Sequence, residues 1–204
     1  MSLIERSVRD LIAAFRSSDP TPGGGSAAAL AGALGAALLA MVASLGRPAT
    51  TEKDDLERLA IAGRREAELS DELASLVDRD AEAYDVVMAT YRLPKASDDE
   101  KRRRSERIQQ ALEGAIASPL DVMRLCTEAA EHATVIASFG NPNAASDVRV
   151  AVELLTAGMR GARANVEINL ESLKDAARAD EIRGEAARLA QKLEAEVDAA
   201  QARL

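Results

Sequence analysis

The chain has 204 residues, and this length predicts a single domain that spans residues 1–204. Its net charge of -8 argues against a general nucleic-acid-binding protein, because such a protein needs a basic face. The single cysteine, Cys126, excludes an internal disulfide framework and fits the reducing cytoplasm. Because aromatic residues make up only 2% of the chain, we expect a core of Ala, Leu and Val side chains in closely packed helices.

Every periodic segment of the chain predicts a helix, and neither strand alternation nor an internal repeat is visible. We therefore expect an all-α fold, a multihelical up-and-down array around a buried Ala-rich helix, with two long helices. The first predicted helix, Leu3 to Arg16, has an apolar face formed by Ile4, Val8, Leu11, Ile12 and Phe15.

A turn rich in proline and glycine, Pro20 to Ser26, precedes a charge-free run from Ala27 to Gly46. We expect the glycines to bend the chain tightly and expose backbone N–H groups, and Ser26 to cap the helix that follows. A helix that is apolar on every side must be buried on every side, so the other helices should surround it. The exposed N–H groups lie at the positive end of the helix dipole, which suits a ligand that carries oxygen atoms.

Other interpretations of this stretch fit the sequence less well. A dinucleotide-binding fingerprint requires a strand before its glycines, and a phosphate-binding P-loop requires a lysine after them. The run is long enough to cross a membrane, but its alanine and glycine content makes it only mildly apolar. A charged amphipathic segment precedes the run, unlike in a signal peptide. We therefore expect a buried helix and no membrane contact.

The middle of the chain predicts one long helix and two further helices. After a break at Gly46-Arg47-Pro48, a long helix should run from about Asp54 to Tyr91, where Leu93-Pro94 ends it. Ser97 to Glu100 forms a capping box that opens the next helix. Because proline favours the first position of a helix, Ser118-Pro119 is expected to start a fifth helix.

The last third of the chain predicts two more helices. After a turn at Gly140 to Asn143, a sixth helix should extend to about Ala177, and a polar helix should follow from Ala179 to Arg203. This last helix has no obvious docking face, and a core with few aromatic residues buries limited area per chain. We therefore expect a homodimer.

Asp80 stands out on the long helix because it shares a stripe with apolar side chains. Asp78 and Asp85 point away from this stripe, and Asp78 is expected to face solvent. A carboxylate in apolar surroundings is costly unless it is hydrogen-bonded or used, and its raised pKa suits proton transfer near neutrality. A structural Asp80, bonded to the N-terminus of another helix, explains the position equally well. The stripe holds Leu69, Leu73, Leu76, Val77, Asp80, Tyr84, Val87 and Tyr91.

Tyr84 and Tyr91 could sandwich a flat heterocycle, although aromatic residues on such a stripe more often fill the core with their hydroxyls paired. Lys95 follows the break after this helix and could reach back over the mouth of the stripe.

Polar and small residues of the sixth predicted helix, and of the turn before it, form a candidate binding surface. Gly158 and Gly161, in the middle of this helix, cost about 1 kcal/mol each relative to alanine, so a helix or a ligand must approach closely there. The two later asparagines offer neutral donors and acceptors that suit an amide-rich ring. The polar residues of the turn exceed what a helix cap needs. The set is Asn141, Asn143, Ser146, Asp147, Gly158, Gly161, Asn165 and Asn169.

Metal chemistry is not expected. Glu128, Glu131 and His132 resemble half of a carboxylate-bridged site, but a di-iron bundle needs a second Glu-x-x-His motif. His132 is the only histidine, and this also removes Ser-His and Cys-His nucleophile schemes.

The segment Pro20 to Leu34, PTPGGGSAAALAGAL, resembles the opening of the formiminotransferase-cyclodeaminase C-terminal domain family, whose stand-alone members include methenyltetrahydrofolate cyclohydrolases. Further similar blocks follow in family order: Asp80 to Tyr84, Leu93 to Lys95, Gly140 to Asn143 with Ser146-Asp147, and Asn165 to Leu170. The resemblance implies an all-helical, dimeric enzyme that acts on folate-bound one-carbon units, with Asp80 as general base and Lys95 as the second catalytic residue. It also implies that the folate pocket is lined by Gly23, Gly24, Gly25, Ser26, Tyr84, Asn141, Asn143, Ser146, Asp147, Asn165 and Asn169.

The chain lacks a transferase portion, which favours hydrolysis of 5,10-methenyltetrahydrofolate to 10-formyltetrahydrofolate. Formiminotetrahydrofolate cyclodeaminase activity, which releases ammonia, is the alternative within the family. A non-catalytic helical scaffold or binding protein is the alternative outside it. One buried carboxylate with a nearby lysine could serve either reaction, and neither reaction requires a metal or redox cofactor.

Overall fold

The fold consists of helices throughout the residues that the structure, a computed structural model, describes: 2–45 and 52–204. No strand occurs in these ranges, so the predicted all-α class is confirmed. The break predicted at Gly46-Arg47-Pro48 lies outside the described residues. The helices are α1 (Val8–Phe15), α2 (Gly24–Ser44), α3 (Lys53–Tyr91), α4 (Asp98–Phe139), the 3-10 helix η1 (Pro142–Ala144), α5 (Ala145–Leu170) and α6 (Ala176–Gln201).

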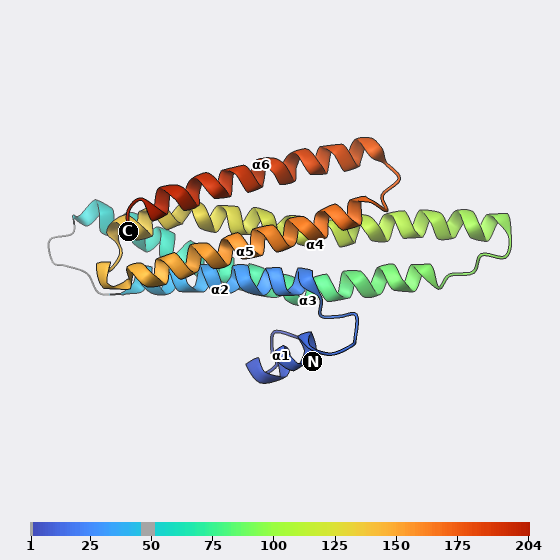
Figure 1. The fold of residues 1–204 in the computed structure, drawn as a ribbon, viewed down its shortest axis with the longest axis horizontal. Coiled ribbons are helices and arrows are strands. Elements are labelled where there is room, and N and C mark those ends of the chain that lie inside the picture. The colour runs from blue at the N-terminus through green and yellow to red at the C-terminus, as the bar shows by residue number, and fades with distance from the viewer. Residues whose placement is uncertain (1, 46–51) are drawn as a thin grey trace.

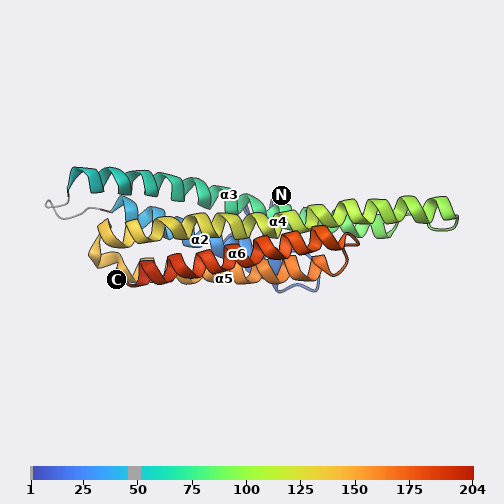
Figure 2. The ribbon, with the colours of Figure 1, turned by 90° about the horizontal axis from the view of Figure 1, so that it is seen from above.

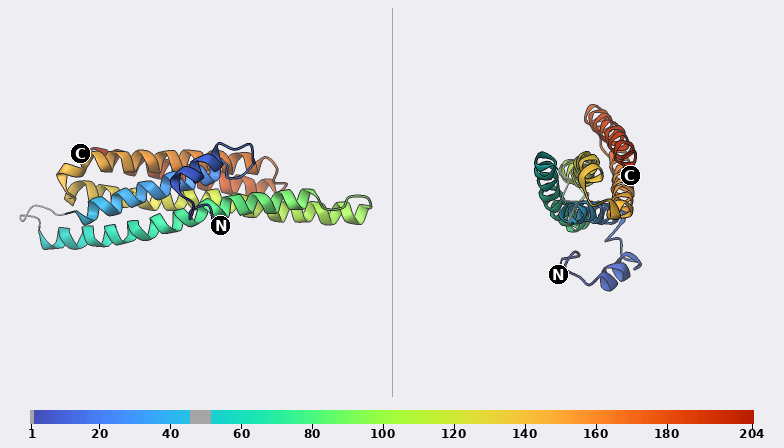
Figure 3. Two further views of the ribbon diagram at one scale, coloured as in Figure 1. Left: turned by 90° about the horizontal axis from the view of Figure 1, so that it is seen from below. Right: turned by 90° about the vertical axis from the view of Figure 1, so that its left-hand side faces the viewer.

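Two long helices, α3 and α4, form an antiparallel hairpin that extends beyond the other helices at one end (Figures 1 and 2). Helices α2 and α5 lie beside the hairpin, and α6 packs on α4 and α5 from the outside. We call residues 92–97, which join α3 to α4 at the extended end, the hairpin tip. The short helix α1 stands away from the bundle, below α2 in the end-on view of Figure 3.

Helix α4 is continuous over 42 residues, so the predicted start of a fifth helix at Ser118-Pro119 is wrong. Pro119 has no N–H to donate to the carbonyl of Ala115, four residues earlier. The Asn169 side chain of α5 donates its Nδ2 to this carbonyl at 3.0 Å. A neighbouring helix thus supplies the hydrogen bond that Pro119 cannot make, and α4 passes through the proline unbroken.

The C-terminal helices also differ from the prediction. Helix α5 ends at Leu170, and α6 begins at Ala176 after Asp175, which accepts a hydrogen bond from the Arg178 N–H. The prediction that the last helix has no docking face is wrong, because small and aliphatic side chains are buried along one side of it. These buried residues are Ala179, Ile182, Ala186, Leu193, Val197 and Ala200.

Small residues let α2 approach its neighbours closely. A Cβ added to Gly32 would lie 2.7 Å from the Cys126 Sγ of α4. A Cβ added to Gly158 of α5 would lie 2.9 Å from the Ala28 carbonyl oxygen of α2. Contacts this short displace the neighbour, so the glycines keep the helix axes close together. Helix α2, rather than a ligand, therefore explains Gly158.

Helix α2 is not buried on every side, contrary to the prediction. Its outer positions carry apolar side chains, and Leu34 is 51% exposed. On α5, Ile168 is 64% exposed on a second apolar stripe, which meets α2 where Gly161 contacts Ala28. We call the two stripes the α2–α5 face. Its exposed members are Ala27, Leu34, Ala37, Met41, Val150, Ala157, Ala164 and Ile168.

Among the described residues, α2 is also the one helix long and apolar enough to cross a membrane, with a mean hydropathy of 2.0. However, 56% of the apolar stretch of α2 is buried inside the bundle, as in the core helix of a folded domain.

Asp78 anchors the N-terminal segment, so the expectation that it faces solvent is wrong. The Ser2 hydroxyl donates to its Oδ2 at 2.6 Å, and the backbone N–H of Leu3 donates to its Oδ1 at 2.5 Å. Burial raises the pKa of Asp78, but these hydrogen bonds outweigh it and hold the pKa below its ordinary value. The predicted first helix is shorter than expected, and Val8 on its apolar face is 75% exposed.

Candidate active site

A cleft of about 460 Å³ lies between α3, α4 and α5, beside the residues that lead into α2. Asp80 lies at the end next to α2, whereas Tyr91 lies about three turns, or about 16 Å, further along α3. Asp80 is the only charged residue among the described residues that line this cleft. The cleft is therefore an elongated, largely uncharged site with a carboxylate at one end.

Asp80 is held by the first turn of α2. The Ser26 hydroxyl donates to its Oδ2 at 3.0 Å, and the Ser26 backbone N–H donates to the same carboxylate. This N–H is one of the first donors of α2, which have no partner inside the helix, and the helix dipole favours a negative charge there. A Cβ on Gly25 would overlap the Asp80 carboxylate. The glycine is therefore required by the close approach of Asp80.

The start of α2 differs from the prediction in this respect. Gly23 is the N-cap, and Gly24 is already helical. No described glycine has a positive φ, so the glycines do not form the expected tight turn. Ser26 is completely buried and bonded to Asp80, so it does not cap the helix. The structure thus places Ser26 behind the carboxylate.

Burial raises the pKa of Asp80, whereas the two hydrogen bonds from Ser26 lower it, and the net direction is upward. A raised pKa brings the carboxylate closer to neutral pH, where a group can both accept and return a proton. Both sequence interpretations of Asp80 hold in geometry: it is bonded to a helix N-terminus, and it faces a cleft.

Tyr84 and Tyr91 line the cleft and do not fill the core. They are 37% and 44% exposed, and neither hydroxyl has a hydrogen-bond partner among the described residues. Val87, on the same stripe, is buried against α4. The rings therefore form one wall that is open to a flat ligand.

Asn165 and Asn169 face the tyrosines from α5. The Asn165 Nδ2 donates to the Gly161 carbonyl at 2.8 Å, and the Asn169 Nδ2 donates to the Ala115 carbonyl. Because both amide nitrogens have backbone partners, each side chain keeps its carbonyl oxygen as an acceptor for a ligand.

Other predicted site residues lie away from this cleft within one chain. Lys95 is exposed in the hairpin tip, beyond Tyr91, and does not line the cleft. Asn141, Asn143, Ser146 and Asp147 lie at the opposite end of α5 from Asn165. Asp147 and Asn165 are about 27 Å apart along the helix axis.

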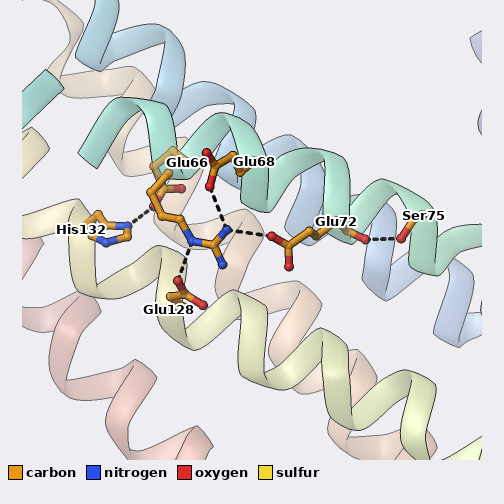
Figure 4. Close-up of polar contacts among 7 residues, drawn as sticks. Glu66, Glu68, Glu72, Ser75, Glu128 and His132 are labelled. Atoms are coloured by element: carbon orange, nitrogen blue, oxygen red, sulfur yellow. Dashed lines mark hydrogen bonds and ion pairs between the residues drawn. The ribbon is translucent and has the colours of Figure 1, made fainter. Parts of the chain in front are cut away.

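A second polar cluster lies between α3 and α4, outside the cleft (Figure 4). Glu66 is completely buried, and its Oε1 lies 2.8 Å from the Nδ1 of His132. Burial raises the pKa of Glu66 to about 7, although the hydrogen bond to His132 lowers it. The sequence contains a signal for this position, since Glu66 lies seven residues after Leu59 and seven before Leu73, both buried.

The residues of the partial metal motif each have another partner. His132 bonds Glu66, Glu128 pairs with Arg65, and Glu131 pairs with Lys192. In the described part of the chain, no three His, Cys, Asp or Glu side chains are grouped so as to hold a metal ion.

Comparison with known proteins identifies the family. The profile of the family described as formiminotransferase-cyclodeaminase matches residues 7–188. The chain belongs to this family. The match covers α1 to α5 and the first half of α6, so it contains the whole cleft.

Relatives within the family carry two names. The chain is 43% identical over 168 residues to the methenyltetrahydrofolate cyclohydrolase of Methylorubrum extorquens, covering 79% of that protein. It is 36% identical over 176 residues to the formimidoyltransferase-cyclodeaminase of Rattus norvegicus, but spans only 32% of it. The solved formiminotetrahydrofolate cyclodeaminase of Thermotoga maritima superimposes with a TM-score of 0.79 at 29% identity, covering 98% of this chain and 93% of that one.

Proposed function

We propose that this protein is a methenyltetrahydrofolate cyclohydrolase, with Asp80 as the group that transfers protons. The observation that carries the proposal is the half-buried Asp80 carboxylate at the end of the cleft, bonded to Ser26. The 43% identity to a cyclohydrolase, over most of both chains, supports the choice of reaction.

The geometry fits the charge of the substrate. The 5,10-methenyl group is an amidinium cation, and Asp80 is the only charge among the described residues that line the cleft. A flat ring of the substrate would stack on Tyr84, and N–H groups of the substrate would meet the carbonyl oxygens of Asn165 and Asn169.

The reaction needs one proton acceptor that later becomes a donor. Asp80 removes a proton from a water molecule while the water oxygen bonds to the carbon between N5 and N10, and this gives a neutral tetrahedral adduct. The adduct hydroxyl then loses its proton to solvent water, the C=O bond forms, and the bond from carbon to N5 breaks. Asp80 returns its proton to N5, so 10-formyltetrahydrofolate and one proton are the products.

Cyclodeaminase activity is the second candidate, and the Thermotoga maritima structure, which covers 98% of this chain, favours it. In that reaction N10 attacks the formimino carbon and loses its proton, and ammonia leaves after protonation. The same carboxylate could perform both transfers.

The decisive experiment follows the absorbance of 5,10-methenyltetrahydrofolate with and without the protein, and ammonia release from 5-formiminotetrahydrofolate in parallel. The proposal expects accelerated loss of the methenyl absorbance and no ammonia. Ammonia release alone would establish the cyclodeaminase, and no turnover of either substrate would favour a non-catalytic binding protein.

We also propose a cytoplasmic location and a reaction that requires neither a metal nor another cofactor. Proton transfer by Asp80 accounts for the attack of water and the release of N5 without a metal or another cofactor. Activity should therefore survive exhaustive dialysis against a metal chelator.

The finer part of the proposal is a homodimer formed through the α2–α5 face. An apolar stripe along two helices is costly to leave in water, and a second copy would cover it. A two-fold axis perpendicular to the long helices would invert the partner end for end. The Asn141 to Asp147 end of one chain would then lie at the cleft of the other.

A further inference from the structure

The far end of the cleft, away from Asp80, carries two cations. Arg104 of α4 donates its Nη2 to the Tyr91 carbonyl at 3.0 Å, and its guanidinium lies 5.5 Å from the centroid of the Tyr91 ring. Because Tyr91 lines the cleft, Arg104 stands at this opening.

The second cation comes from the segment after α5. Ser172 lines the cleft, and its carbonyl accepts a hydrogen bond from Gln109 Nε2 at 3.2 Å. Lys174 is fixed on the same part of α4: its N–H donates to Gln109 Oε1 at 2.7 Å, and its Nζ donates to Ser105 Oγ at 2.6 Å. The Lys174 ammonium group thus lies beside Ser105, which follows Arg104 in α4.

Neither cation forms an ion pair with a carboxylate in the described part of the chain. The neighbouring Arg102 and Arg103 do, since both pair with Asp99. The cleft is therefore electrically polar from end to end, with a carboxylate at Asp80 and two uncompensated positive groups past Tyr91.

From this juxtaposition we infer that Arg104 and Lys174 form a carboxylate-binding subsite, which holds the glutamyl carboxylates of the folate tail. The inference rests on the proposed function and names the part of the substrate that the second end of the cleft recognises. With the one-carbon unit at Asp80, the p-aminobenzoyl ring lies in the cleft between Tyr84 and the α5 wall, and the chain continues towards Tyr91. The glutamate then emerges beside the two cations. A guanidinium and an ammonium suit the two carboxylates of a terminal glutamate.

The test compares two substrates in the same variants: 5,10-methenyltetrahydrofolate and the corresponding tetrahydropteroate, which lacks glutamate. Arg104→Gln and Lys174→Gln should each raise KM for the folate by about fivefold to tenfold, with kcat unchanged, because charged hydrogen bonds of this kind are lost. Neither change should alter KM for the pteroate. Arg104→Lys, which keeps the charge, should keep KM for the folate close to the wild-type value. Arg102→Gln is the matched control.

If Arg104 only packs on Tyr91, its substitution would raise KM for the folate and the pteroate equally, and this result would overturn the inference. Unchanged KM values for both substrates would also overturn it. Calorimetric binding of folate and pteroate to the same variants gives the comparison without turnover. A wild-type protein that turns over neither substrate would refute the proposed function. The difference in affinity between folate and pteroate would still test the carboxylate-binding subsite.

Discussion

At Asp80, burial and hydrogen bonding act on the same carboxyl group in opposite directions. Burial disfavours the charged form, whereas the Ser26 hydroxyl and N–H favour it. The two effects leave the pKa raised while the carboxylate stays fixed in one orientation. A proton-transfer group needs both properties, since it must change its charge without losing its position.

The first prediction compares two aspartates on α3. Asp80→Asn should lower turnover by about two to four orders of magnitude, because an amide cannot accept the proton of the attacking water. Folate binding should weaken much less than turnover, since Asn keeps the shape of the side chain and loses only its attraction to the cation. Asp85→Asn is the matched control, because Asp85 is exposed and makes no side-chain hydrogen bond to a described residue, and it should cost less than about 0.5 kcal/mol. Single-turnover kinetics that show equal activity for both variants would remove Asp80 from the mechanism.

The second prediction concerns the adjacent glycines. Gly25→Ala should reduce turnover on the order of 100-fold, because the new methyl group must displace the Asp80 carboxylate. Gly24→Ala adds a methyl group that meets Asn165 Nδ2 at an ordinary 3.5 Å, so it should be nearly neutral. Thermal unfolding of both variants separates loss of stability from loss of activity. Equal turnover per folded molecule would show that Asp80 tolerates displacement.

Single residues differ in how far the sequence alone can place them. Helical periodicity places Asp80 among apolar side chains, because the stripe and the carboxylate lie on one element. The partner of Asp80 could not be predicted, since Ser26 is 54 residues away. The partner of Asn169 could not be predicted either, since its amide donates to the Ala115 carbonyl, which Pro119 leaves without a backbone donor. Such pairings depend on how helices dock.

Between the elements α3 and α4, a buried glutamate and its partly buried histidine partner link stability to pH. Glu66 and His132 face each other across the hairpin, and the partly exposed ion pairs of Arg65 with Glu68, Glu72 and Glu128 lie beside them (Figure 4). Folding raises the pKa of Glu66 from 4.5 to about 7, chiefly by burial. The hydrogen bond between His132 and Glu66 raises the pKa of His132 as well.

The third prediction follows from the sign of these shifts. A folded state with raised pKa values binds protons more tightly than the unfolded chain. The stabilisation from Glu66 is therefore complete below pH 4.5 and is lost as the pH rises through about 7. The free energy of unfolding should fall as the pH rises from about 5 to about 8, by at most about 1.4 kcal/mol per pH unit for each proton.

Urea titrations across this range measure the slope. Glu66→Gln should flatten it, because the substitution removes the titrating carboxyl and the main cause of the His132 shift. Glu68→Gln, on the exposed side of the same helix, should leave it unchanged. A slope that survives Glu66→Gln would assign the pH dependence to other groups.

Elements were predictable where the pattern is local. The α3 helix and the capping box of α4 appear from periodicity and spacing alone, and Ser97 and Glu100 form the predicted reciprocal bonds. Pro119 misled the prediction because a proline that starts a helix and a proline inside one have the same local sequence. What distinguishes them is a hydrogen bond from α5.

Over the whole molecule, the predicted site residues fall into two groups at opposite ends of α5. Asp80, Tyr84, Asn165 and Asn169 share the cleft, whereas Asn141 to Asp147 lie about 27 Å away along α5. The rise of a helix already separates Asp147 from Asn165 along α5, but the sequence does not show which of the two lies beside Asp80 of α3. The exposed α2–α5 face between the two ends offers a physical reason for the separation, because an inverted second copy would bring the groups together.

The last prediction tests this assembly by complementation. If each site combines Asp80 of one chain with Asp147 of the other, Asp80→Asn and Asp147→Asn should each be nearly inactive alone. Mixed in equal amounts after subunit exchange, half of the dimers are hybrids, and each hybrid has one intact site. The mixture should therefore regain about a quarter of the wild-type activity. Leu34→Glu, in the middle of the α2–α5 face, should give a monomer of 21.6 kDa in light scattering and abolish the recovery. Ala195→Glu, at an exposed position of α6, is the control and should leave both unchanged. A wild-type monomer, or full activity of Asp147→Asn alone, would mean that each chain builds its site from the cleft alone, and hybrids without activity would refute the shared site.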